Sequence, residues 1–317
     1  MKKKSSAVAK AIGFTAGIVG VGSYLTFYEV MGRNAKLAPA LGNLFVSESG
    51  LEKTDVPDER QVWFDSQNFE EFEMINDKNQ RLRGYLLPAD NPSDVYVFGS
   101  HGYRSSGKGE FCLMTKFYHD KGYNVFLVDH QASGESDGKY IGFGYHECPD
   151  CLKWLEFLME RFGNNIQIIL HGVSMGCATV TMMCGSGRLP ENVKFVVADC
   201  GYTSAYDEFM SNVGKLRPVV APFMSIASKI NKKISGYEFR DANPLEAVKN
   251  ATVPMLFVHG SMDTFVPTEM VYRLYNACSS ADKDLLVVEG AAHAESYPKN
   301  SALYESKVSE FIEKYIK

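Results

Sequence analysis

Short apolar runs alternate with amphipathic stretches along the chain from about residue 70 onward. The run at 123–129, YNVFLVD, is dominated by apolar residues, as strands buried on both faces of a parallel sheet are. Residues 145–161 have helical spacing, with Leu152, Leu155 and Leu158 near one face. By the same criteria, strands are predicted at 82–87, 95–100, 123–129, 166–170, 193–198, 255–259 and 284–288. Helices are predicted at 109–121, 145–161, 174–184, 269–277 and 301–315.

Strands that alternate with helices form βαβ units, so the pattern predicts an α/β protein. We expect a mostly parallel, eight-stranded sheet with helices on both faces. Residues 203–250 interrupt the alternation, because they contain no strand pattern but many large apolar side chains. We interpret them as a helical cap insertion over the sheet. Four of its side chains are candidate substrate contacts: Phe209, Met210, Phe223 and Met224.

The N-terminus has a different character. Lys2, Lys3 and Lys4 precede an uncharged apolar stretch at 11–28, which is near the lower length limit for a membrane-spanning helix. The lysines before this stretch favour a cytoplasmic N-terminus and an extracytoplasmic remainder. We therefore predict a membrane anchor or signal segment at 1–35 and a single large domain at 36–317. The alternatives are secretion after signal cleavage, or a cytoplasmic protein in which this stretch packs on the domain.

The composition of the chain excludes several classes of partner and cofactor. The 317 residues are 45% apolar and 22% charged, with a net charge of -5, as in an ordinary globular protein. No basic cluster lies beyond the N-terminus, so we expect no nucleic-acid partner. Cys148 and Cys151 have the spacing of a metal or redox pair, but the further ligands that zinc requires do not accompany them. We expect two ordinary thiols there, no metal site and no cofactor.

The pentad GVSMG at 172–176 lies between a predicted strand and a predicted helix. In this context G-x-S-x-G is typical of a nucleophile elbow, a tight turn that holds a serine in a strained conformation. The N-terminus of the following helix favours negative charge at the same place. A second match at 134–138 surrounds Ser136, but it leads into a loop and flanks the serine with two acids. We therefore predict Ser174 as the nucleophile.

A serine becomes nucleophilic when a base takes its proton and an acidic residue orients that base. After a nucleophile elbow, the acid precedes the histidine along the chain. Asp263 follows the strand at 255–259 within a turn, and His293 lies among small residues after the strand at 284–288. We predict His293 as general base and Asp263 as the acid that orients it. Asp199, at the end of an earlier strand, is the alternative acid.

Such chemistry also needs an oxyanion hole, in which two backbone N–H groups bind the negative oxygen of the intermediate. The residue after the nucleophile, Met175, is expected to supply one of them. The other is expected from Tyr103, in the loop that follows the strand at 95–100.

Several segments resemble bacterial α/β-hydrolases of the serine aminopeptidase-like or uncharacterised esterase type, some of which carry an N-terminal membrane segment. The similar segments include SHGYRSSG at 100–107, ILHGVSMG at 169–176, PMLFVHGSMDTFVP at 254–267 and GAAHAESYPKN at 290–300. The resemblance covers about 70–315 and implies the α/β-hydrolase fold, the same triad and hydrolysis of an ester-like bond. It also implies a structural loop around Ser136, although Gln131 and Ser133 stand where that loop commonly carries Arg and His.

These observations predict a serine hydrolase that cleaves a small-molecule carboxylic ester through an acyl-serine intermediate. An aminopeptidase acting on short peptides is the second hypothesis. It requires an acidic site for the α-ammonium group of the substrate, for which Glu208 and Asp207 are candidates. The third hypothesis is a membrane-tethered binding protein that has lost catalysis.

Overall fold

The computed structural model describes residues 23–24, 27–34 and 58–317. These residues contain an eight-stranded sheet with the order β1-β2-β4-β3-β5-β6-β7-β8. β2 is antiparallel to both of its neighbours, and all other pairs are parallel. The predicted mostly parallel α/β architecture is therefore confirmed. The strands are β1 (Glu70–Ile75), β2 (Arg81–Leu87), β3 (Val95–Ser100), β4 (Asn124–Asp129), β5 (Gln167–Val173), β6 (Val193–Asp199), β7 (Met255–Gly260) and β8 (Lys283–Val288).

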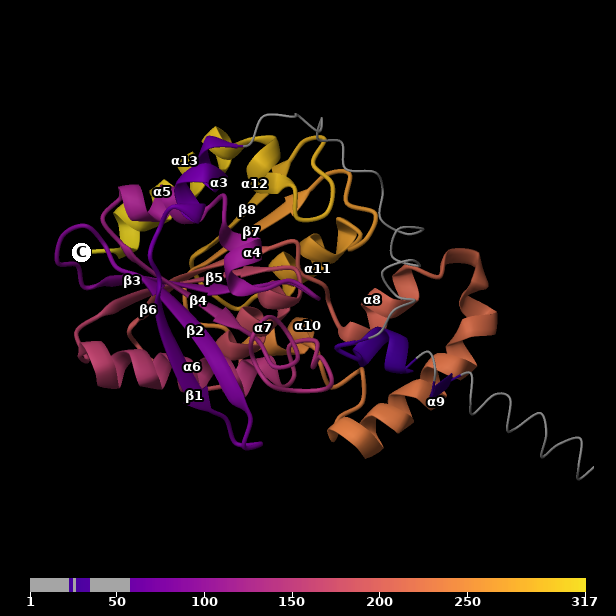
Figure 1. Cartoon of the computed structure of the whole chain (residues 1–317). Coiled ribbons are helices and arrows are strands. Elements are labelled where there is room, and N and C mark those ends of the chain that lie inside the picture. The colour runs from indigo at the N-terminus through magenta and orange to yellow at the C-terminus, as the bar shows by residue number, and fades with distance from the viewer. Residues whose placement is uncertain (1–22, 25–26, 35–57) are drawn as a thin grey trace, which may run out of the picture.

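Helices cover both faces of the sheet (Figure 1). One layer consists of α3 (Glu59–Asp65), α4 (Gly107–Phe111), α5 (Thr115–Asp120), α12 (Ser296–Lys299) and α13 (Ser301–Tyr315). The other consists of α6 (Glu147–Phe162), α7 (Met175–Cys184), α10 (Pro244–Ala247) and α11 (Glu269–Ala277). Successive side chains of a strand point to opposite faces, so Ile168 packs under the second layer and Ile169 under the first.

Two elements differ from the sequence prediction. β1, EEFEMI, was not recognised, because this edge strand has charged residues on one side and only Phe72 and Met74 pointing toward the core. The helix predicted at 109–121 is divided into α4 and α5. At the division, the Thr115 hydroxyl donates a hydrogen bond to the Phe111 carbonyl, a local bond that competes with regular helix geometry.

The segment predicted as a cap insertion, 203–250, contains α8 (Ala205–Ser211), the 3-10 turn η1 (Gly214–Leu216) and α9 (Arg217–Ser235), and η2 (Val248–Asn250) follows α10. α9 has proline in its first turn and ends at Gly236, whose φ of 86° provides a left-handed C-terminal cap. Met224 is buried, but Phe223 lies about 100° around the helix from it and is 37% exposed. Phe223 therefore faces solvent on this helix, and its role as a substrate contact stays a prediction.

Residues 27–34 pack on the main body of the protein. Phe27 and Met31 are fully buried, and they join a group of side chains that we call the cap cluster. The packed body thus includes residues that the sequence assigned to the N-terminal segment. Among the residues described, no helix has the length and apolar character needed to cross a bilayer. Most of the predicted anchor or signal segment at 1–35 lies outside the described residues. The fully or largely buried members of the cap cluster are Phe27, Met31, Ala132, Ile141, Phe143, Met175, Ala178, Tyr202, Ala205, Tyr206, Met210, Met224, Ala227, Tyr237, Phe239, Ala242, Val266 and Met270.

Candidate active site

Ser174 occupies the turn between β5 and α7 in a strained conformation, with φ 56° and ψ -114°. The flanking glycines are required for this turn. A Cβ at Gly172 would lie 2.3 Å from the Gly176 carbonyl oxygen, and one at Gly176 would lie 1.8 Å from the Ser100 carbonyl oxygen. The turn therefore has the geometry of a nucleophile elbow.

Three side chains from separate loops form a continuous hydrogen-bonded chain. His293 Nε2 is 2.9 Å from Ser174 Oγ, and His293 Nδ1 is 2.8 Å from Asp263 Oδ2. With the proton on Nδ1, the imidazole donates to Asp263 and leaves the Nε2 lone pair facing the serine hydroxyl. The arrangement can thus remove a proton from Ser174 and stabilise the imidazolium that results.

Asp263 is held firmly in the ionised state. Its Oδ1 accepts hydrogen bonds from the backbone N–H groups of Phe265 and Val266, and His259 Nε2 lies 3.1 Å from Oδ2. Burial raises the pKa of Asp263, but the hydrogen bonds from His259 and His293 outweigh it and lower the pKa to about 2. The Phe265 ring packs on His293, with 4.9 Å between the ring centroids.

The alternative serine and the alternative acid have other partners. The Ser136 hydroxyl donates to the Asp129 carbonyl at 2.6 Å and accepts the Arg83 N–H at 2.8 Å, so it has a structural role in its loop. Asp199 Oδ2 accepts a hydrogen bond from Tyr304 at 3.0 Å. Burial raises the pKa of Asp199 to about 6. Neither side chain hydrogen-bonds His293.

The two predicted oxyanion donors lie on either side of the elbow. Met175 begins α7, and its backbone N–H has no acceptor among the described residues. The same is true of the Tyr103 N–H. The neighbouring Gly102 is close to the serine, since a Cβ added there would lie 3.4 Å from Ser174 Cβ. Both N–H groups therefore remain available to a ligand at this place.

The N-terminal segment binds the loop that contains Tyr103. The Tyr103 hydroxyl donates to the Val30 carbonyl at 2.6 Å, and Arg104 Nη2 donates to the carbonyls of Glu29 and Gly32 at 2.8 and 3.2 Å. The carbonyls of Glu29 and Val30 belong to the last turn of a helix and Gly32 follows that helix, and a guanidinium is favourable at this end. Arg104 has a φ of 58°, so the loop is held in a conformation that an arginine rarely adopts.

The same segment also binds the loop around Ser136. The Ile141 N–H donates to the Met31 carbonyl at 2.7 Å, and the Arg33 N–H donates to the Lys139 carbonyl at 2.9 Å. The Arg33 guanidinium reaches the carbonyls of Gly134 and Ser136. Residues 29–33 thus connect two loops on the carboxyl-end edge of the sheet, where Ser174 lies.

Arg104→Ala is expected to loosen this attachment. Hydrogen bonds from charged donors contribute about 1.5–3 kcal/mol each, so a net loss of about 2 kcal/mol would raise the detached population about 30-fold. Tryptic cleavage after Arg33 should accelerate accordingly, as followed by mass spectrometry. Lys108→Ala is the control, because Lys108 lies nearby but does not contact the segment. An unchanged cleavage rate in Arg104→Ala would show that other contacts hold the segment.

The remaining predicted contacts lie in the cap cluster. Met210 and Met224 are buried there, and Phe209 packs against it between Phe143 and Phe239. Ser174 is only 6% exposed, so the elbow is covered. Flexible methionines and small residues of this cluster could rearrange to admit an apolar group.

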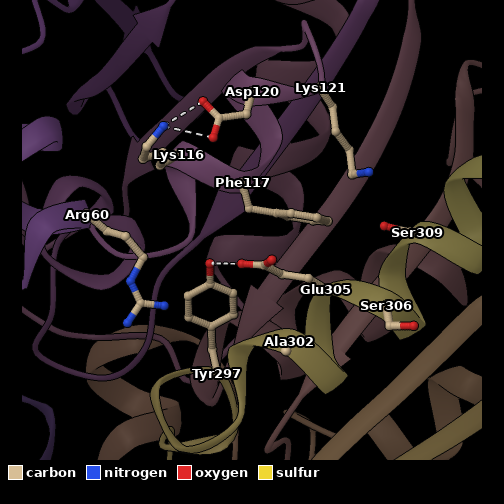
Figure 2. Close-up of a pocket in the computed structure, with 10 residues that line it drawn as sticks. All are labelled: Arg60, Lys116, Phe117, Asp120, Lys121, Tyr297, Ala302, Glu305, Ser306 and Ser309. Atoms are coloured by element: carbon tan, nitrogen blue, oxygen red, sulfur yellow. Dashed lines mark hydrogen bonds and ion pairs between the residues drawn. The ribbon is translucent and has the colours of Figure 1, made fainter.

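Two other features lie apart from this site. Cys148 and Cys151 are buried thiols in α6, and burial raises the pKa of Cys148 to about 12. The described residues contain no group of side chains suited to hold a metal ion. A surface hollow of about 700 Å³ lies between α3, α5 and α13, where Tyr297 donates to Glu305 (Figure 2). None of its lining residues belongs to the Ser174 site.

The chain belongs to the prolyl oligopeptidase family, whose profile matches residues 110–317. It is an α/β-hydrolase. The uncharacterised protein YqkD of Bacillus subtilis is 30% identical over 235 residues, covering 73% of this chain and 75% of YqkD. The Pyrococcus furiosus esterase Pf2001 aligns with a TM-score of 0.64 at 23% identity, over 86% of this chain and 99% of the esterase. The Pyrococcus horikoshii acylaminoacyl peptidase aligns with a TM-score of 0.58 at 19% identity, over 82% of this chain and 44% of the peptidase.

Three features of the site were not found from the sequence. Phe265 packs on the imidazole, Arg104 anchors the donor loop, and residues 27–34 bind beside the elbow. Phe265 follows Asp263 so closely in the chain that its nearness to the triad could have been inferred from the sequence. The sequence offered packing of the stretch at 11–28 on the domain only as an alternative to a membrane segment, and it did not indicate which loops the N-terminal residues contact.

Proposed function

We propose that this protein is a carboxylic-ester hydrolase that works through an acyl-serine intermediate. The single observation that carries the proposal is the hydrogen-bonded chain from Ser174 through His293 to Asp263. In this proposal Ser174 is the nucleophile, His293 the general base and Asp263 the acid that fixes the imidazole tautomer.

The reaction proceeds in two halves. Ser174 Oγ attacks the ester carbonyl carbon while His293 Nε2 takes its proton, and the N–H groups of Tyr103 and Met175 bind the oxyanion. The imidazolium then protonates the leaving alcohol as the ester bond breaks. A water molecule attacks the acyl-serine in the same way, which releases the carboxylic acid and regenerates Ser174.

The surroundings of the serine favour an ester over a peptide with a free N-terminus. The cap cluster offers apolar side chains for an acyl group. The two acids that could bind an α-ammonium group are poorly suited to it. Burial raises the pKa of Glu208 well above its ordinary range, which favours the uncharged form. Asp207 accepts the Thr203 hydroxyl at 2.9 Å and lies 3.8 Å from Arg273.

The test is hydrolysis of p-nitrophenyl esters, from acetate to a long acyl chain, combined with labelling by a fluorophosphonate probe. Ester turnover with the label on Ser174 supports the proposal, and the chain-length profile measures the acyl site. Labelling together with cleavage of aminoacyl amides but not esters would instead support a peptidase. Absence of both labelling and turnover would support a binding protein.

A further inference from the structure

The cap helix α9 presents apolar side chains to solvent. Leu216 and Val219 are 64% and 65% exposed, and Phe223 and Ile234 are 37% and 40% exposed. Leu216 is the residue directly before α9, and Leu216, Val219 and Phe223 are spaced by three and four residues, so they lie along one side of the helix and its first turn. Single exposed apolar residues are ordinary, but an aligned set on one helix indicates a contact surface.

The charged residues within the stretch of sequence that contains this apolar strip all have the same sign, although Asp207 and Glu269 lie near Arg217. Residues 209–237 contain no Asp or Glu, although the whole chain has a net charge of -5. Among the described residues, only one of the five basic residues in this stretch forms an ion pair, Lys232 with Glu238 at 2.9 Å. The five basic residues, all exposed, are Lys215, Arg217, Lys229, Lys232 and Lys233.

The combination fits a particular partner. A helix that lies in a membrane interface inserts its apolar side chains at the headgroup and acyl boundary, while lysine and arginine extend toward anionic headgroups. A protein partner would need a complementary acidic and apolar face, whereas an anionic bilayer supplies both properties over any area. We propose that α9 docks on the surface of an anionic lipid bilayer.

The position of α9 agrees with this proposal. Figure 1 shows α9 at the outer edge of the molecule, away from the sheet, where a flat surface can reach it. Its inner side chains, Met224 and Ala227, share the cap cluster with Phe27 of the N-terminal segment. On that segment Tyr24 and Tyr28 are 47% and 36% exposed, and tyrosine is favoured at the interface between membrane and water. Docking through α9 therefore brings the cap next to the lipid, and it does not depend on the ester hydrolysis proposed above.

The experiment places a fluorescent reporter on α9 of the full chain. Phe223→Trp is mixed with vesicles of phosphatidylglycerol or phosphatidylcholine whose acyl chains carry bromine, which quenches tryptophan on contact. Leu303→Trp is the matched control, because Leu303 is 44% exposed on α13 in the opposite layer. The signal of the parent chain, from Trp63 and Trp154, is subtracted in both cases.

We expect quenching of Phe223→Trp by phosphatidylglycerol vesicles, weaker quenching by phosphatidylcholine, and none of Leu303→Trp. Adding Lys215→Ala and Arg217→Ala to Phe223→Trp should raise the lipid concentration for half-maximal quenching by about 30-fold, since each basic residue near the surface strengthens binding about fivefold. All variants retain the N-terminal segment, so differences between them belong to α9. Absence of quenching at position 223, or equal quenching with and without the two basic residues, would overturn the proposal. Dimerisation that Phe223→Glu abolishes, without quenching, would assign the surface to a second copy.

Discussion

Ser174→Ala is expected to lower kcat for p-nitrophenyl esters by about a million-fold, the loss typical when the nucleophile of a Ser-His-Asp triad is removed. The hydroxyl is the atom that forms the acyl-enzyme bond, and no other hydroxyl hydrogen-bonds His293 among the described residues. Folding should be little affected, because the alanine side chain keeps the Cβ that the elbow already accommodates. Initial rates on purified protein, with thermal unfolding measured in parallel, provide the check.

Ser136→Ala is the matched control, since Ser136 is the other serine within a G-x-S-x-G pentad. Its hydroxyl forms two hydrogen bonds within its own loop, so the variant should lose about 1–2 kcal/mol of stability while keeping its turnover. If Ser174→Ala kept its activity and Ser136→Ala lost it, the assignment of the nucleophile would be reversed.

Asp263→Asn is expected to lower kcat by about ten-thousand-fold. An asparagine amide can donate a hydrogen bond to His293 Nδ1, which favours the tautomer with the proton on Nε2. That tautomer has no lone pair facing Ser174 and cannot accept its proton. KM should change much less than kcat, because Asp263 does not contact the ester.

Asp199→Asn is the control for this variant. Asp199 is equally buried, but it bonds Tyr304 and not His293, so we expect turnover within about tenfold of the parent. A larger loss of kcat in Asp199→Asn than in Asp263→Asn would show that Asp199, at the end of β6, is the acid of the triad.

The pH profile gives a separate check on Asp263. Because its folded pKa of about 2 lies below the ordinary aspartate pKa of 3.8, its ionisation stabilises the fold above pH 3.8, and this contribution is lost as the pH falls toward 2. Asp263 therefore remains ionised throughout the range in which ester hydrolysis is measured. A decline of kcat/KM between pH 5 and 7 in the parent chain must therefore come from another group, and a midpoint that belongs to Asp263 is expected only near pH 2.

Local signals explain how the sequence indicated the candidate site. Ser174 lies in a glycine-bounded turn between two clear elements, and Asp263 and His293 each follow an apolar strand. Parallel strands have their carboxyl ends at one edge of the sheet, so positions after such strands indicated loops on the same side of the sheet. The packing of His293 against Phe265 required the detailed path of the turn.

Long-range packing explains what was missed. The spacing of α9 does not tell which of two neighbouring residues, Phe223 or Met224, turns inward, because both sides of this helix are apolar. The attachment of residues 27–34 depends on carbonyls that accept hydrogen bonds from Arg104 and on side chains that pack in the cap cluster. Neither interaction leaves a periodic pattern in the sequence.

The attachment of the N-terminal segment also constrains the order of folding. Glu29 and Arg104 are 75 residues apart in the chain, and Arg33 and Ser136 are 103 apart. Such contacts close long loops, which costs conformational entropy before any contact compensates for it. The loops that receive residues 29–33 are positioned by β3 and β4, so the segment can dock only after the sheet has formed. Residues 29–33 therefore leave the ribosome before the loops that receive them, but they reach their native position after those loops. A protein fused to the N-terminus is expected to interfere with the docking of residues 29–33 and not with assembly of the sheet.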